Sequence, residues 1–223
     1  MADNEVTSID VFEVSASKID EFAASWHDSC GYLSGAAGFR GGWLHRAHEV
    51  DVRFPVVDVA RWDSAADAIS ARDDPRRRQW LDALPDEVRA STALYETLYD
   101  FRPPTDRRLD GPGVTFMNIF EISADAVDGF AVGWSDRARL MRSASGFRDV
   151  RLHRAVTPEA RFRLVNVAHW DSVSAWQAAA QNSTMTAATN AARTHATPNT
   201  AIYRVVAHMN STHAPHRSFT GIA

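Results

Sequence analysis

The chain has 223 residues, of which 45% are apolar and 23% are charged, proportions typical of a globular protein rather than a disordered one. Its 24 basic and 28 acidic side chains give a net charge of −4, which argues against a nucleic-acid partner because such binders concentrate Lys and Arg on one face. The single cysteine, Cys30, excludes an intrachain disulfide framework and a multi-cysteine metal site. The acidic N-terminal stretch, together with the lack of an apolar run of roughly 20 residues, predicts a cytoplasmic protein with no membrane partner.

The N-terminal part of the chain alternates between strand and helix patterns. Period-two alternation over residues 9–14 predicts a strand. Apolar side chains at helical spacing over residues 19–33 predict a helix, with Ser17 as its N-cap. Two further strands are expected at residues 43–48 and 54–62, and the second of these is apolar on both faces, as in a covered sheet.

The rest of this first pattern is a helix and a strand. The helix should begin after Ser64, whose side chain can cap it. The basic cluster Arg76, Arg77 and Arg78 is expected at a solvated helix start. A last strand is predicted at residues 95–101, so the order is β-α-β-β-α-β, the ferredoxin-like arrangement.

The whole pattern occurs twice. Residues 6–17 read VTSIDVFEVSAS and residues 114–125 read VTFMNIFEISAD, while VDVARWDS at residues 57–64 returns as VNVAHWDS at residues 165–172. Each matching pair of positions is 108 residues apart, so the chain consists of two copies of one small domain. We place the first copy at residues 1–101, a linker rich in Pro and Gly at 102–113, the second copy at 114–210 and a C-terminal tail at 211–223.

A four-stranded sheet with both helices on one face leaves its other apolar face bare. A second sheet of the same kind can cover that face. We therefore predict an α+β protein in which two tandem ferredoxin-like (βαββαβ) repeats pair their sheets into one barrel within the chain. The inner faces of the two sheets would enclose a cavity for each copy.

Alternation along the strands sorts the candidate cavity residues by face. Asn166 and Trp170 share one face of their strand, and we interpret that face as lining the cavity, because a buried amide needs hydrogen-bond partners. The opposite, Val-rich face is interpreted as packing against the helices. The other candidates are the first-copy counterparts Asp58 and Trp62, the first-strand residues Asp10, Asn118 and Phe120, and the second-strand residues Trp43, His45, Arg151 and His153.

A structural reading stays open for several of these residues. Trp62 and Trp170 can be core residues, and His45 and His153 can be buried structural histidines. The sequence holds no Gly-rich phosphate loop and no H-x-x-x-H helix, so we expect neither nucleotide chemistry nor a metal site.

The run NVAHWDS at residues 166–172, the Gly146-Phe147 turn upstream of it and a histidine on the second strand resemble the antibiotic biosynthesis monooxygenases. These proteins belong to the dimeric α/β-barrel superfamily, and the resemblance covers both copies. It implies oxidation of anthrones or hydroquinones of aromatic polyketides to quinones by O2, without a metal or a tightly held cofactor. The family's Asn and Trp match Asn166 and Trp170, its histidine matches His153 and His45, and its aromatic six positions after the Trp matches Trp176.

The sequence also departs from the family pattern. In the first copy Asp58 replaces the Asn and Ala68 replaces the aromatic, and a family Arg on the second helix would fall near Leu81 or Thr189. Haem-degrading relatives have an Asn that Asn118 matches, but their further Trp would fall at Ala179. Other relatives open a ring of angucyclines with reduced flavin (FMN or FAD), which a flavin reductase would supply, and this reaction stays open.

The resemblance leads to a mechanistic expectation. An electron-rich polyphenol would stack on Trp170 and Trp176, receive hydrogen bonds from Asn166 and Asn118, and exchange protons with His153. Association of two chains into a homodimer stays open. Two alternatives remain, a non-oxidative polyketide cyclase or isomerase with Asp58 and His45 as its acid and base, and a barrel that binds an aromatic ligand without chemistry.

Overall fold

Each half of the chain folds as the expected succession of strands and helices. The structure, a computed structural model, describes residues 5–103, 113–181 and 196–212. The first half contains β1 (Val6–Glu13), α1 (Ile19–Cys30), β2 (Phe39–Ala47), β3 (Val56–Trp62), α2 (Ala65–Arg72), α3 (Pro75–Asp82) and β4 (Arg89–Phe101). The second half contains β5 (Val114–Glu121), α4 (Val127–Met141), β6 (Phe147–Ala155), β7 (Leu164–Trp170), α5 (Val173–Ala180) and β8 (Thr197–Asn210). The predicted α+β fold of two ferredoxin-like repeats is confirmed, whereas most of the proposed linker and tail lies outside the described residues.

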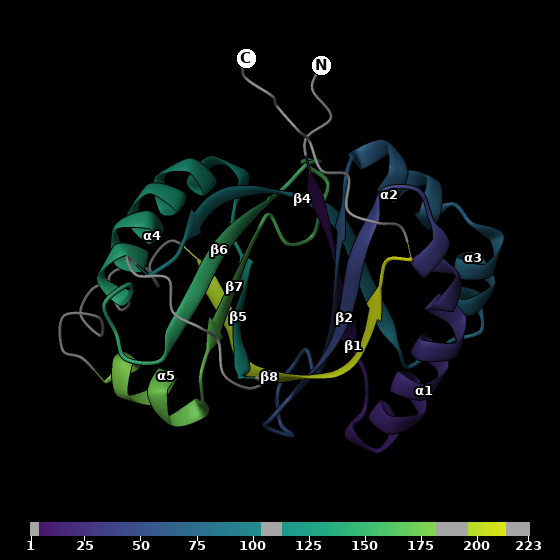
Figure 1. The fold of residues 1–223 in the computed structure, drawn as a ribbon, viewed down its shortest axis with the longest axis horizontal. Helices are drawn as coiled ribbons and strands as arrows, with labels where there is room; N and C mark the ends of the chain where they lie inside the picture. Colours follow the sequence, from purple (N-terminus) through teal and green to yellow (C-terminus); the bar gives the residue numbers. More distant parts are fainter. Residues whose placement is uncertain (1–4, 104–112, 182–195, 213–223) are drawn as a thin grey trace, which may run out of the picture.

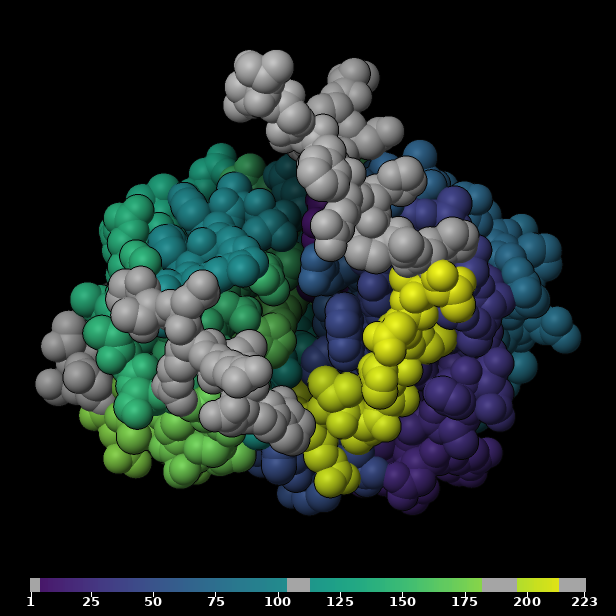
Figure 2. All heavy atoms as spheres, in the orientation of Figure 1, coloured from purple at the N-terminus to yellow at the C-terminus, as the bar shows by residue number. Residues whose placement is uncertain are grey.

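The eight strands close into one antiparallel barrel in the order β1-β3-β2-β8-β5-β7-β6-β4. The last strand of each half joins both sheets, since β4 pairs with β1 and β6, and β8 pairs with β5 and β2. Figure 2 shows β8, in yellow, lying against the purple and blue first half. This double pairing explains why β4 begins before the predicted residues 95–101, because it must reach from its own sheet to the other.

The helices cover the outside of the barrel. α1, α2 and α3 pack on one side and α4 and α5 on the other, with the strands between them (Figure 1). None of the helices within the described residues is both long enough and apolar enough to cross a membrane.

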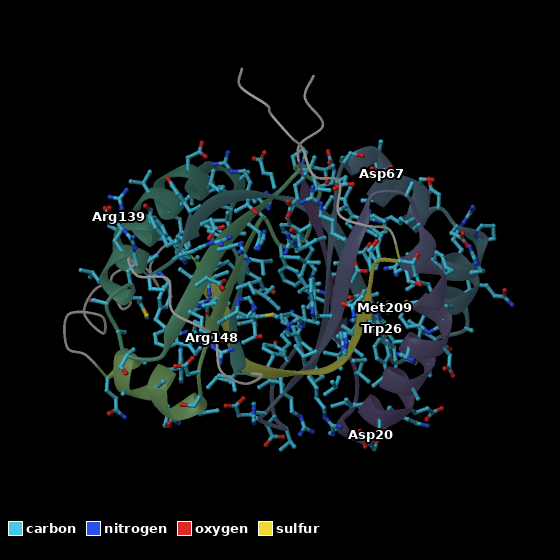
Figure 3. All side chains as sticks on the ribbon, viewed as in Figure 1. Asp20, Trp26, Asp67, Arg139, Arg148 and Met209 are labelled. Atoms are coloured by element: carbon cyan, nitrogen blue, oxygen red, sulfur yellow. The ribbon has the colours of Figure 1, made fainter. Side chains whose placement is uncertain are left out.

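Side chains from both sheets fill the barrel interior (Figure 3). This interior cluster includes Val57 and Val59 from β3 and Val165 and Val167 from β7. Two further clusters lie between each sheet and its own helices, and the labelled Trp26 belongs to the first of these. The Val-rich strand faces therefore point into the barrel, and the prediction that they pack against the helices is wrong. An eight-stranded barrel is only wide enough for side chains to fill it, and the compact branched valines meet that requirement.

The helix starts follow local capping chemistry. Ser64 accepts a hydrogen bond from the Asp67 amide at 3.1 Å, as predicted. Ser17, by contrast, lies within a 3-10 turn, and α1 begins after Lys18 without a side-chain cap. The arginine cluster does begin α3, but Arg77 is buried rather than solvated.

Candidate functional site

The predicted site residues lie on two opposite faces of the sheet. Side chains directly opposite each other in an antiparallel pair share a face. Asn166 lies opposite Asn118, and both point toward the helices of the second half, in the direction of Trp170. His153 lies opposite Val165, which points into the barrel. Asn166 and His153 therefore do not belong to one site.

The first half divides its residues in the same way. Asp58 lies opposite Asp10 on the helix side, whereas His45 lies opposite Val57 on the barrel side. The acid–base pair that a cyclase would need is thus separated by the sheet. Trp43 and Arg151 also face the barrel, because they lie opposite Val59 and Val167. The prediction that the Asn166 face lines the barrel interior is wrong, because valines fill the interior and the Asn166 face points toward the helices.

The helix side of the second half gathers hydrogen-bond donors and aromatic rings. Asn166 is 3% exposed, so its side-chain amide is buried. The indole N–H of Trp170 is also buried and has no acceptor among the described residues. Asn118 is half-buried, and its carbonyl oxygen accepts a hydrogen bond from the Thr200 hydroxyl. Buried polar groups normally have partners, so the Trp170 N–H marks a place where a ligand oxygen can bind.

Two aromatic rings lie beside these donors and form the partly exposed wall of the site. Phe116 on β5 and Trp176 on α5 have ring centroids 4.8 Å apart and an interplanar angle of 31°. Both side chains are half-buried, so they can present ring faces to a planar ligand. Phe116 was not among the sequence candidates, although the exchange of Ser8 for Phe116 between the copies was a visible signal. Phe120, which was a candidate, packs edge-on against Phe130 at 4.8 Å in the core.

The equivalent region of the first half is filled by its own polar network. The Arg77 guanidinium bonds the Asp10 carboxylate, and both side chains are buried. The Trp26 indole donates to Asp58 at 3.0 Å. Burial, and then the nearby Asp10 carboxylate, raise the pKa of Asp58 to about 7. Asp10 and Asp58 thus form a buried charged cluster with Arg77 rather than an open pocket.

Trp62 also has its partners within the first half. Its indole donates to the Ser8 hydroxyl at 3.1 Å, and its ring packs edge-on against Phe39 at 5.1 Å. Its counterpart Trp170 contacts Phe147 in the same geometry at 5.3 Å. The two tryptophans therefore occupy the same structural position, and they differ in whether the indole N–H has an acceptor.

The two barrel-side histidines are neutral at ordinary pH. Burial lowers the pKa of His45 to about 4 and that of His153 to about 3. His153 lies 4% exposed, with its Nδ1 atom unpaired among the described residues. A histidine of this kind cannot exchange protons near neutral pH, so the proton-shuttling role expected for His153 has no support. Among the described residues, no group of three or more His, Cys, Asp or Glu side chains could hold a metal ion.

The chain is similar to several solved barrels. An anthrone oxidase-like protein is 16% identical with a TM-score of 0.71, and the match covers 95% of each chain. A candidate monooxygenase from Fusobacterium nucleatum is 9% identical with a TM-score of 0.66, covering 94% of this chain and 96% of its own. A major regulator of staphylococcal pathogenesis is 7% identical with a TM-score of 0.52, covering 90% of this chain and 99% of its own. At these identities the similarity shows the fold alone.

The family comparison adds sequence evidence for the second half. No curated protein matches the chain at a significant level. Residues 113–191 match the family model described as antibiotic biosynthesis monooxygenase, and this segment contains Asn118, Asn166, Trp170 and Trp176. The chain is therefore a tandem barrel in which residues 113–191 match the antibiotic biosynthesis monooxygenase family model.

Proposed function

We propose that the protein is an oxygenase that oxidises an electron-rich polycyclic phenol, such as an anthrone, to a quinone with O2. The observation that carries this proposal is the buried Trp170 N–H, which has no acceptor among the described residues. It lies with the buried Asn166 amide and the Phe116–Trp176 ring pair in the half that matches the monooxygenase family model. The rings would hold the flat substrate, and the amide and indole would fix its oxygen atom.

The donors of this site favour the deprotonated substrate. An anthrone loses a proton from its CH2 group to give an enolate, whose oxygen carries negative charge. Hydrogen bonds from the amides of Asn166 and Asn118 stabilise that charge in a site shielded from bulk water. These side chains donate hydrogen bonds but do not take up a proton, so the proton passes to water at the half-exposed Asn118.

The electron-rich enolate then reduces O2. The CH2 carbon loses four electrons and two hydrogens, one oxygen atom becomes the new quinone carbonyl, and the other leaves as water. The apolar walls around Trp170 exclude water from the intermediate. A second candidate, oxidative ring opening, would use the same residues with reduced flavin as a diffusible cosubstrate.

Oxygen uptake and product mass on 1,8-dihydroxyanthrone would test the proposal, with and without reduced FMN. Asn166→Ala is expected to lower kcat by roughly 100-fold or more, the effect of removing one donor to a developing oxyanion. The matched first-half variant Asp58→Asn should keep the wild-type rate, because its side chain lies outside the proposed site. Unchanged turnover in Asn166→Ala would refute the site, uptake only with FMN would identify the flavin-dependent reaction, and binding without turnover would indicate a non-catalytic barrel.

A further inference from the structure

The two halves have the same fold, but they carry different residue types at one equivalent position of the sheet. Asp10 and Asp58 in the first half correspond to Asn118 and Asn166 in the second, each pair directly opposite across its two strands. The first pair carries two carboxylates, and the second pair carries none.

In the first half a charged side chain of the protein lies against the carboxylate pair. Arg77 reaches from α3 to the Asp10 carboxylate, and its side chain is 8% exposed. Trp80, from the same helix, packs against Phe22 at 5.6 Å and donates its indole N–H to Ser25 at 2.9 Å. α3 therefore seals this side of the sheet with a charged group and a large ring, both already partnered.

In the second half the corresponding chemistry is missing from the sequence. The positions 108 residues after Arg77 and Trp80 carry Met185 and Ala188, which lie outside the described residues and can supply neither a guanidinium nor an indole. The carboxylates that would need a cation are replaced by neutral amides. A salt bridge between these positions is thus excluded by residue type alone.

The indole N–H groups follow the same division. Ser8 accepts from Trp62 in the first half, but its counterpart is Phe116, whose side chain has no oxygen that could accept from Trp170. The exchange removes the internal acceptor and leaves the Trp170 N–H buried without one among the described residues. It also supplies the partner for Trp176, whose first-half counterpart is the buried Ala68.

We propose that the chain binds one aromatic ligand, in the second half only, and that the first half is a closed counterpart in which Arg77 and Ser8 occupy the polar positions that the ligand satisfies in the second. This inference rests on the site of the proposed function. It predicts one ligand per chain, in contrast to the two sites that a symmetric barrel of two identical halves would have.

Calorimetric titration with 1,8-dihydroxyanthraquinone, an unreactive planar probe, would measure the stoichiometry. The seven tryptophans also give separate 15N indole resonances, which single Trp→Phe variants can assign. We expect one probe per chain, with shifts of the Trp170 and Trp176 resonances and none at Trp62 or Trp80. Two probes per chain, or shifts at Trp62 and Trp80, would overturn the inference.

Matched variants separate a local effect from a general one. Phe116→Ser, which installs the first-half residue, should weaken binding by at least tenfold and shift the Trp170 resonance before any probe is added. Ser8→Ala in the first half should leave the affinity unchanged. Equal losses in both variants, or no binding by the wild type, would contradict the single site. One bound probe without oxygen uptake on the anthrone would refute the proposed oxygenase and leave this inference standing.

Discussion

Replacing Arg77 by methionine tests whether the charged cluster is a structural element of the first half. The Arg77 and Asp10 side chains are 8% and 4% exposed, and Asp58 lies directly opposite Asp10. Arg77→Met would leave both buried carboxylates without a compensating cation. Removing one partner of a buried ion pair costs about 3–5 kcal/mol. At about 2–4 °C per kcal/mol for a chain of this size, Tm should fall by roughly 6–20 °C.

Two further variants make this experiment specific. The double variant Asp10→Asn/Arg77→Met gives the first half the residue types of the second and removes one buried charge of each sign, so it should be more stable than Arg77→Met alone. Arg40 forms ion pairs with Glu5 and Asp63, but its side chain is 44% exposed. Arg40→Met should therefore cost only about 0–1 kcal/mol.

Urea unfolding at pH 7, followed by circular dichroism and tryptophan fluorescence, would give the free energy of unfolding for all four proteins. The reasoning would be refuted if Arg77→Met cost no more than Arg40→Met. It would also be refuted if adding Asp10→Asn to Arg77→Met lowered the stability further.

Two more predictions concern titratable groups on the two faces of the sheet. Because burial raises the pKa of Asp58 to about 7, the folded chain retains a proton that the unfolded chain releases from about pH 4, and the free energy of unfolding should fall as pH rises through this window. Asp58→Asn should make that fall smaller, so the free energy of unfolding of the variant relative to the wild type should be higher at pH 8 than at pH 5. Urea titrations at both pH values would measure this difference, and an equal difference at the two pH values would argue against the prediction. His153→Leu should leave the kcat for the anthrone within about threefold, since His153 faces the barrel and exchanges no proton near pH 7; a large loss of kcat in a folded variant would return His153 to the mechanism.

The sequence alone was sufficient for the fold because its signals are local or repeated. The constant spacing of 108 residues between Gly38 and Gly146, or Tyr95 and Tyr203, establishes two copies of one domain. Strand alternation and the capping residue Ser64 place the elements, since both depend on neighbours in the chain. The bare sheet face then requires a second sheet, which gives the barrel. The Asn and Trp of the oxygenase motif were likewise readable, because Asn166 and Trp170 lie four positions apart on one strand face.

Only the tertiary structure decided which face of each strand is the inside of the barrel. Alternation divides residues into two faces but assigns neither to the core, because the pattern is symmetric until a packing partner is known. The valines fill the narrow barrel and the amides meet the helices, which separated His153 from Asn166. The burial of Arg77 was equally invisible in the sequence, since its partner Asp10 lies 67 residues away and is brought close only when α3 packs on the sheet.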